Sequence, residues 1–300
     1  MINAAGVVKT FGDFKALDGL SIHVKKGSVY GLVGPNGAGK TTIIKTIMGV
    51  YRANEGEIRI DNEITYENKD IKNRVICISD DLFFYPTYSI IETAKLYSGI
   101  YPMWSWEKFD KMKEIFKIDV KKKVRRLSKG MQKQVAFWLG LSSQPEVMSL
   151  DEPVDGLDPV MRRNVWKLML QAVAEKEMTV LVSSHNLREL EDVCDYVGIL
   201  HEGKVVIEKS LDDIRGNIHK LQIAFSDRSF PDALGTKLEI LDKTGFGSVN
   251  MLIVKGDADD IIKIVGDYNP VVCDILPLTL EEVFIYELGG MGYEFETILL

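Results

Sequence analysis

The sequence predicts an α/β domain built around a largely parallel sheet, followed by a small α+β domain. In the first part of the chain, short runs rich in β-branched residues alternate with segments of helical periodicity, which is typical of strands joined by crossover helices. The run Val29–Val33 leads into a glycine-rich turn and then into a helix expected from about Lys40 to Met48. After about residue 215 this pattern changes to short strands with few helices. We therefore place the two domains at residues 1–215 and 216–300.

The composition is that of a soluble globular protein. Of 300 residues, 46% are hydrophobic and 27% are charged, and the net charge is −7, so a core can form and a basic face for nucleic acid is not expected. No apolar run approaches the roughly 20 residues that span a bilayer, and the N-terminus has no basic-then-apolar signal pattern. We expect a cytosolic protein whose membrane role, if it has one, is peripheral.

A helical subdomain is expected over about residues 88–140. Ser89 and Glu92 form the capping-box pattern Ser-x-x-Glu, and Trp106, Phe109 and Phe116 follow at helical spacing. The α/β pattern then resumes, with strands expected at 147–150, 179–183, 196–200 and 204–207 and a helix at about 160–174. In the second domain we expect strands at 221–225, 237–241, 248–254 and 271–276, a helix at 258–266, and a last helix behind the capping box of Thr279 and Glu282.

Residues 34–41 read GPNGAGKT, which satisfies the phosphate-binding pattern G-x-x-x-x-G-K-[ST]. Its glycines let the backbone bend so that N–H groups point at phosphate oxygens, and the following helix adds its positive N-terminal end. Lys40 can reach the β- and γ-phosphates, and Thr41 can place its hydroxyl on Mg²⁺. The residues expected at the nucleotide are Gly34, Pro35, Asn36, Gly37, Ala38, Gly39, Lys40, Thr41 and Thr42.

Residues 147–152 read VMSLDE, an apolar strand that ends in two acids. In open α/β sheets, ligands bind at the C-terminal ends of the strands. Asp151 is therefore expected to hold Mg²⁺, directly or through water, and Glu152 to polarise the attacking water. Alone this pattern is weak, but beside a phosphate-binding loop it indicates a Walker B site.

Residues 127–132 read LSKGMQ and lie between these two motifs. Together with these two motifs, LSKGMQ makes the stretch of roughly residues 3–215 resemble the ABC ATPases. The signature motif of that family usually reads LSGGQ. The resemblance implies a P-loop NTPase fold of ABC ATPase type, with a mixed sheet core and a helical subdomain. It also implies that Ser128, Lys129 and Gly130 contact the γ-phosphate of ATP bound to a second protomer. Lys129 replaces the usual glycine, and it is either an extra cation at the phosphate or a solvated lysine.

Further positions follow from the same resemblance. DGLD at 155–158 resembles the D-loop, which implies that Asp158 crosses the dimer interface. His185 resembles the switch histidine, a third catalytic residue beside Glu152 and Lys40, and Phe11 matches the aromatic residue that stacks on adenine. The Q-loop glutamine is absent: Asp80 falls at its position, although Asp81 remains an alternative, and Asp80 could ligate Mg²⁺.

The resemblance implies an ATPase that uses ATP and Mg²⁺ and works as a homodimer or heterodimer with membrane-spanning subunits on separate chains. Such a protein would be located at the cytoplasmic face of the membrane. No nucleic-acid partner is expected. The motif forms resemble the export branch, which suggests drugs, antibiotics or amphipathic peptides as cargo. The alternative is a soluble ABC ATPase acting on nucleic acid or ribosomes, although such proteins usually carry two cassettes or a long coiled-coil insertion. A P-loop kinase would explain neither the signature nor His185.

Overall fold

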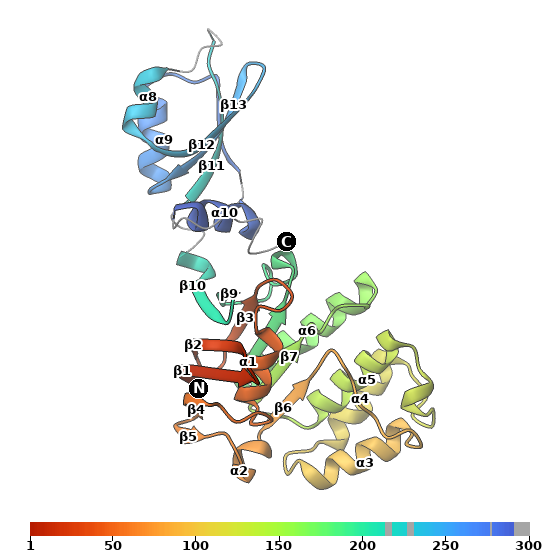
Figure 1. Cartoon of the computed structure of the whole chain (residues 1–300). Coiled ribbons are helices and arrows are strands. Elements are labelled where there is room, and N and C mark those ends of the chain that lie inside the picture. Colours follow the sequence, from red (N-terminus) through yellow and green to blue (C-terminus); the bar gives the residue numbers. More distant parts are fainter. Residues whose placement is uncertain (214–217, 227–230, 277, 291–300) are drawn as a thin grey trace. The chain divides into compact units, whose positions relative to one another are not determined.

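The computed structural model describes residues 1–213, 218–226, 231–276 and 278–290. The chain divides into two compact units, residues 1–208 and residues from 209 onward (Figure 1). The boundary expected after residue 215 lies a few residues later than this division, and residues 214–217 themselves are outside the described part.

The first unit is organised by a six-stranded sheet in the order β10-β9-β3-β8-β7-β6. Its strands are β3 (Val29–Val33), β6 (Val75–Ile78), β7 (Val147–Asp151), β8 (Thr179–Ser184), β9 (Tyr196–His201) and β10 (Lys204–Ser210). The neighbours from β9 to β6 all pair in parallel. Every residue of β3, β7 and β8 is buried, as expected for strands covered on both faces. Their C-terminal ends therefore meet at one edge of the sheet.

A second sheet in this unit, which is antiparallel, covers the helix that follows the glycine-rich turn. Its order is β2-β1-β4-β5, with β1 (Ile2–Phe11), β2 (Phe14–Val24), β4 (Glu55–Ile60) and β5 (Glu63–Ile64). Ile43, Ile44 and Ile47 of α1 (Lys40–Ile47) are fully buried and share a hydrophobic core with Leu17 and Leu20 of β2. The core thus fixes the start of α1 against both sheets. A short helix, α2 (Lys69–Lys72), precedes β6.

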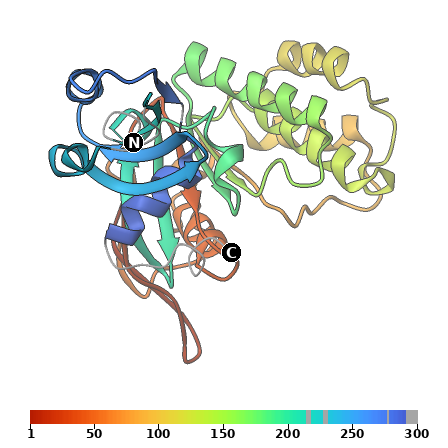
Figure 2. The ribbon, with the colours of Figure 1, turned by 90° about the horizontal axis from the view of Figure 1, so that it is seen from above.

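The expected helical subdomain contains α3 (Ile90–Ile100), α4 (Trp106–Phe116), the 3₁₀ turn η1 (Val124–Arg126) and α5 (Lys129–Ser142). Figures 1 and 2 both show these helices grouped to one side of the strands. The capping box at the start of α3 is confirmed, because Ser89 and Glu92 bond each other's backbone N–H groups. The rings of Trp138 and Phe109 stack with centroids 4.7 Å apart, which joins α5 to α4. The chain returns to the sheet through β7, then α6 (Pro159–Lys176) and the 3₁₀ turn η2 (Leu187–Glu189).

The second unit has a β-α-β-β-α-β order, with a sheet arranged β12-β13-β11-β14 in which all neighbours are antiparallel. This is the ferredoxin-like arrangement. Its elements are β11 (Ile218–Ala224), α8 (Asp232–Lys237), β12 (Glu239–Phe246), β13 (Val249–Lys255), α9 (Ala258–Gly266), β14 (Val272–Leu276) and α10 (Leu280–Gly290). Leu221 and Leu252 of the sheet and Ile261 and Val265 of α9 belong to its core.

One sequence expectation in this unit is wrong in part. A strand was expected at 237–241, but Lys237 ends α8 and the strand begins at Glu239. The helix was missed because it has only six residues and contains Gly235, a poor helix former. Within the described residues, no helix of either unit has the length and apolar character needed to cross a bilayer.

Candidate active site

Three loops meet at the edge where the parallel strands end. The glycine-rich loop follows β3, Glu152 follows β7, and His185 follows β8. A cavity of about 350 Å³ lies at this edge. Its walls are formed by Phe14, Ala16, Pro35, Asn36, Gly37, Gly39, Lys40, Thr41, Thr42, Asp80, Asp151 and Glu152. Gly34 and Ala38, which were also expected at the nucleotide, are not among the residues that line it.

The glycine-rich loop can take its shape only with glycine at two positions. Gly39 has a φ of 109°, and a Cβ there would lie 2.7 Å from the Ala16 carbonyl oxygen. A Cβ on Gly34 would lie 2.2 Å from the Leu200 carbonyl oxygen. Gly39 is also the N-cap of α1 and supplies no side-chain cap, so the first N–H groups of the helix can turn to an anion.

Lys40 is buried and places its ammonium inside this loop. The Nζ donates to the carbonyl oxygens of Gly34 at 2.6 Å and Pro35 at 3.2 Å, and it lies 3.6 Å from Glu152 Oε1. Burial lowers the pKa of the Lys40 ammonium, while the carboxylates of Glu152 and Asp151 act in the opposite direction. The cavity therefore contains a cation where phosphate oxygens would enter.

Thr41 and Asp151, two expected Mg²⁺ ligands, already touch. Thr41 Oγ1 donates to Asp151 Oδ2 at 2.7 Å, and Ser183 Oγ donates to Asp151 Oδ1 at 2.6 Å. One hydroxyl and one carboxylate fit Mg²⁺, which usually takes one or two carboxylates and completes its octahedron with water and phosphate oxygens. The described residues contain no cluster of three His, Cys, Asp or Glu side chains that could hold a metal by themselves. The site therefore fits a magnesium ion that arrives with a phosphorylated ligand.

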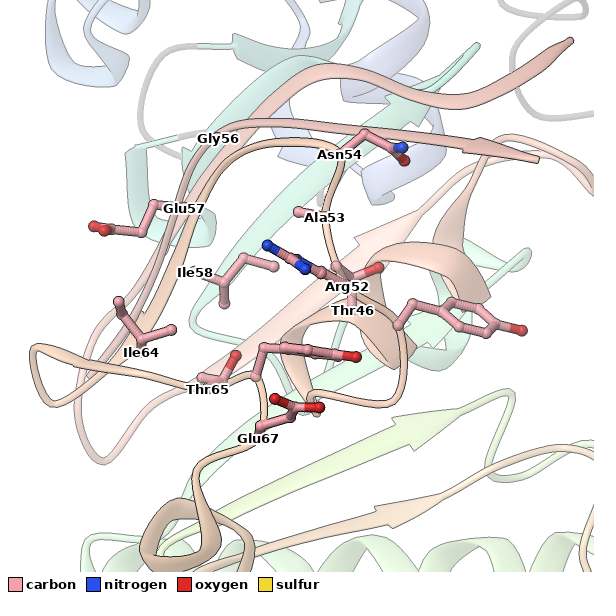
Figure 3. A pocket seen from close by; sticks show the side chains of 12 residues that line it. Thr46, Arg52, Ala53, Asn54, Gly56, Glu57, Ile58, Ile64, Thr65 and Glu67 are labelled. Carbon is pink, nitrogen blue, oxygen red and sulfur yellow. The ribbon is translucent and has the colours of Figure 1, made fainter. Parts of the chain in front are cut away.

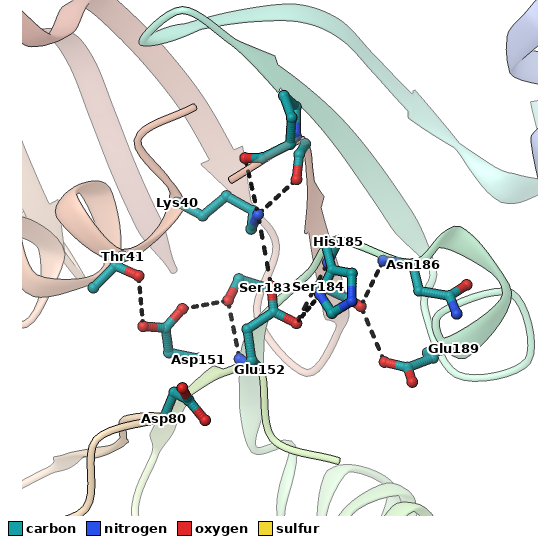
Figure 4. Close-up of polar contacts among 12 residues, drawn as sticks. Lys40, Thr41, Asp80, Asp151, Glu152, Ser183, Ser184, His185, Asn186 and Glu189 are labelled. Carbon is teal, nitrogen blue, oxygen red and sulfur yellow. Dashed lines mark hydrogen bonds and ion pairs between the residues drawn. The ribbon is translucent and has the colours of Figure 1, made fainter. Parts of the chain in front are cut away.

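Glu152 is held from several directions (Figure 4). Its Oε2 lies 2.9 Å from His185 Nδ1, and its backbone N–H donates to the Ser183 carbonyl oxygen at 3.2 Å. Its φ is 47°, in the left-handed region that residues other than glycine seldom adopt. Its Oε1 is buried and accepts no hydrogen bond from the described residues. This oxygen faces the Lys40 ammonium, with which it forms an ion pair at 3.6 Å, and Glu152 is one of the residues that line the cavity.

The signature residues lie elsewhere. Ser128 Oγ accepts from the Met131 N–H at 3.3 Å and caps α5, which begins at Lys129. Gly130 lies close to the D-loop, because a Cβ there would be 3.0 Å from the Gly156 carbonyl oxygen. Asp158 caps α6 by accepting from the backbone N–H groups of its first turn. The cavity lining includes none of Ser128, Lys129, Gly130 and Asp158.

Two aromatic residues stand near the start of β2. Phe11 is 45% exposed and contacts the Tyr51 ring edge-on, with centroids 5.3 Å apart. Phe11 does not line the cavity, whereas Phe14, which is 63% exposed, does. Sequence reasoning singled out Phe11 by resemblance and overlooked Phe14, three positions away on the other side of the turn.

Sequence reasoning also missed Ser183 and Lys133. Ser183 bonds Asp151 because β8 pairs with β7 in a register that aligns these two residues. Lys133 is buried on α5, and its Nζ lies 2.9 Å from Asp80 Oδ1 and 2.8 Å from the Glu152 carbonyl oxygen. Asp80, expected as a metal ligand, thus lines the cavity but already has a partner. The signal in the sequence that could have identified Lys133 is a lysine on the buried face of a helix.

A second cavity of the first unit, of about 440 Å³, lies between the end of α1 and β4 and β5. Figure 3 shows its lining, which includes Arg52, Glu57 and Glu67. The Arg52 guanidinium lies 5.9 Å from the centre of the Tyr66 ring. None of the expected site residues lines this cavity.

Comparison with known proteins agrees with this geometry. Residues 17–155 match the family model described as "ABC transporter". The chain is 30% identical over 290 residues to the ABC transporter ATP-binding protein YtrB of Bacillus subtilis, covering 97% of this chain and 99% of the relative. It is 34% identical to the bacitracin transport ATP-binding protein BcrA of Bacillus licheniformis, covering 76% of each chain. A solved structure described as an ATP-binding subunit of an ABC transporter superimposes with a TM-score of 0.67 at 26% identity, covering 72% of this chain and 92% of the other.

Proposed function

This chain belongs to the family of ABC transporter ATP-binding proteins, and on that premise we propose that it powers an exporter whose membrane-spanning subunits are separate chains. Proteins of this family are ATPases that act as dimers with membrane subunits. The proposal rests on one observation above all: a buried lysine, a hydroxyl–carboxylate pair and the carboxylate of Glu152 meet at one cavity of about 350 Å³.

The residues of the cavity divide the work of ATP hydrolysis. The glycine-rich loop and Lys40 would bind the phosphates, and Thr41 and Asp151 would hold Mg²⁺, which would neutralise negative charge on the phosphates. In this proposal the Glu152 carboxylate accepts a hydrogen bond from the attacking water. The water oxygen attacks the γ-phosphorus, and the bond to the β–γ bridging oxygen breaks. His185 does not line the cavity, and in this proposal it keeps the Glu152 carboxylate oriented through the contact between Nδ1 and Oε2.

A second copy completes the site in this proposal. The N-terminus of α5 and Asp158 do not line the cavity of their own chain. A helix N-terminus attracts anions, and α5 begins at Ser128 with Lys129 next to it. In a head-to-tail dimer, these residues of one copy would contact the γ-phosphate held by the other. ATP would thereby close the dimer, and hydrolysis would reopen it.

An exposed aromatic cluster supports docking to a membrane subunit. Phe83 is 79% exposed, and its ring contacts Tyr85, which in turn contacts Tyr88. Exposed contiguous aromatic side chains mark interaction sites more often than free surface. The cluster follows directly on Asp80 and precedes α3, so a partner bound there would lie next to the catalytic edge. Docking of this kind would place the chain at the cytoplasmic face of the membrane.

The relatives suggest the class of cargo. BcrA is described as a bacitracin transport protein, and YbhF of Escherichia coli, 30% identical over 221 residues, as a probable multidrug transporter protein. These descriptions, with the export-type motifs, support drugs, antibiotics or amphipathic peptides as the exported compounds.

Co-expression with a candidate membrane-spanning subunit tests the proposal. We expect the chain to be recovered in washed membranes only with that subunit, and Phe83→Ser to reduce recovery, while the control Val271→Ser, at an exposed apolar residue of the second unit, does not. The complex should lower the amount of an amphipathic peptide antibiotic that cells retain, and Glu152→Gln should abolish this effect. Recovery with ribosomes or nucleic acid instead of membranes would contradict the proposal and favour a soluble ABC ATPase.

A further inference from the structure

The environment of Lys133 is unusual for a lysine. Its side chain is only 6% exposed, and it lies on the same helix as the fully buried Phe137 and Trp138. A buried ammonium is costly unless it is paired and hydrogen-bonded. Lys133 satisfies both conditions, through the Asp80 carboxylate at 2.9 Å and the Glu152 carbonyl oxygen at 2.8 Å. A single side chain therefore joins α5, the loop after β6 and the end of β7.

The carbonyl that Lys133 binds belongs to a strained residue. A residue other than glycine that is held in the left-handed region is strained, and it persists there only when its surroundings impose that conformation. At Glu152, Ser183 fixes the peptide N–H and Lys133 fixes the carbonyl oxygen. With the carbonyl released, the backbone could relax toward a common conformation, which would turn the carboxylate away from the cavity. The direction of the Glu152 side chain thus depends on the Lys133 contact.

We propose that Asp80 and Lys133 form a positioning pair that locks the backbone of Glu152 so that its carboxylate stays at the cavity. The inference rests on the proposed role of Glu152. Lys133 makes the contact with the carbonyl oxygen, and Asp80 neutralises and orients the buried ammonium. A glutamine at position 80 could donate or accept a hydrogen bond but could not balance this charge. The pair therefore gives the aspartate at the Q-loop position a function other than binding Mg²⁺.

A double-mutant cycle on the full chain tests the pair. The variants are Lys133→Met, Asp80→Asn and their combination, with Lys133→Arg as the conservative replacement and Asp81→Asn as the neighbouring exposed control. For each variant, kcat, the equilibrium dissociation constant for ATP and the Mg²⁺ concentration that gives half-maximal rate are measured. Thermal unfolding with and without ATP shows whether each variant is folded.

We expect Lys133→Met to lower kcat about 30-fold while ATP affinity changes less than about threefold, because a small misplacement of a catalytic group affects mainly the chemical step. Asp80→Asn should lower kcat about fivefold, and the double variant should match Lys133→Met, because Asp80 acts through Lys133. Lys133→Arg should recover most of the rate. Asp81→Asn should equal the unchanged chain, and the Mg²⁺ requirement should stay constant throughout.

Several results would overturn the pair. Additive losses, with a raised Mg²⁺ requirement in Asp80→Asn, would make Asp80 a metal ligand. Loss of ATP binding and of thermal stability in Lys133→Met, without recovery in Lys133→Arg, would make Lys133 purely structural. If Lys133→Met hydrolyses ATP at the full rate and the unchanged chain is active, the positioning role of the pair is refuted while the proposed function stands. Absence of hydrolysis by the unchanged chain would refute the proposed function and, with it, the pair.

Discussion

The sheets of the two units are buried in different ways, and this difference decides where chemistry can occur. In the first unit, β3, β7 and β8 are buried at every residue, whereas in the second unit β11 and β13 contain both buried and partly exposed positions. Strands covered on both faces can present polar groups only at their ends. Asp151 and Ser183 consequently meet at one edge, where the loops converge.

In the second unit, by contrast, polar side chains connect a helix to strands of the sheet. Lys220 of β11 pairs with Glu282 of α10, and the Tyr286 hydroxyl of α10 donates to Asp242 of β12 at 3.0 Å. Burial alone would raise the pKa of the Glu282 carboxyl. The hydrogen bond from Lys220 outweighs this effect and keeps that pKa below its ordinary value. These contacts fasten α10 to the sheet. The comparison teaches that similar residue types line the proposed nucleotide site in one unit and stabilise packing in the other.

The largest expected effect is at the catalytic edge. Lys40→Met removes the cation from the phosphate loop, and we expect kcat/KM for ATP to fall about 10²- to 10³-fold. The matched control is Lys26→Met, because Lys26 is an exposed lysine that pairs with Glu177. Steady-state hydrolysis by both variants measures the difference. Equal activity of the two would mean that the cavity is not the ATP site.

Core substitutions should show that the two units unfold in separate transitions. Leu252→Ala in β13 should destabilise the second unit by about 2–5 kcal/mol, because it opens a cavity in a fully buried core. The matched change Leu32→Ala in β3 should destabilise the first unit instead. In thermal unfolding, ATP should raise the transition that Leu32→Ala lowers and leave unchanged the one that Leu252→Ala lowers. A single transition affected equally by both would contradict the division.

A smaller effect is expected from the hydroxyl that orients Asp151. Ser183→Ala removes the 2.6 Å hydrogen bond, and we expect kcat to fall about tenfold with a raised Mg²⁺ requirement, since a bond to a charged group contributes about 1.5–3 kcal/mol. The control is Ser149→Ala, a fully buried serine in the middle of β7. A Mg²⁺ titration of the rate distinguishes the two. An unchanged requirement in Ser183→Ala would remove Ser183 from the site.

The smallest effects concern two helix caps of the same design. Asp158 accepts from the first N–H groups of α6, and Asp257 from those of α9. Alanine at either position should cost about 1 kcal/mol of stability. Only Asp158→Ala should also weaken ATP-dependent dimerisation, which analytical ultracentrifugation can measure. The same loss in Asp257→Ala would show that the caps affect assembly through stability alone.

The sequence predicted most of the helices and strands. It also predicted those site residues that come directly after a strand of the parallel sheet. The bounds expected for β3 and α9 are confirmed, because Val29–Val33 and Ala258–Gly266 have unambiguous periodicity and clear stops. The segments containing Lys40, Glu152 and His185 could be expected to converge, since each follows a parallel strand and these strands end at one edge. Lys133 and Ser183 could not be assigned, because their partners depend on helix packing and strand register. Phe11 and Phe14 could not be ranked, because which of them reaches the cavity depends on the turn between β1 and β2.

Glu152→Gln tests the central claim most directly. It keeps the size of the side chain and removes the charge that polarises the water, so ATP binding should persist while hydrolysis falls at least about 10²-fold. ATP turnover and sedimentation of the same sample should show an inactive protein that stays dimeric with ATP and Mg²⁺, while the unchanged chain returns to monomer as it hydrolyses. Normal turnover by Glu152→Gln, or no ATP-dependent dimer, would contradict the account of this edge as the catalytic site.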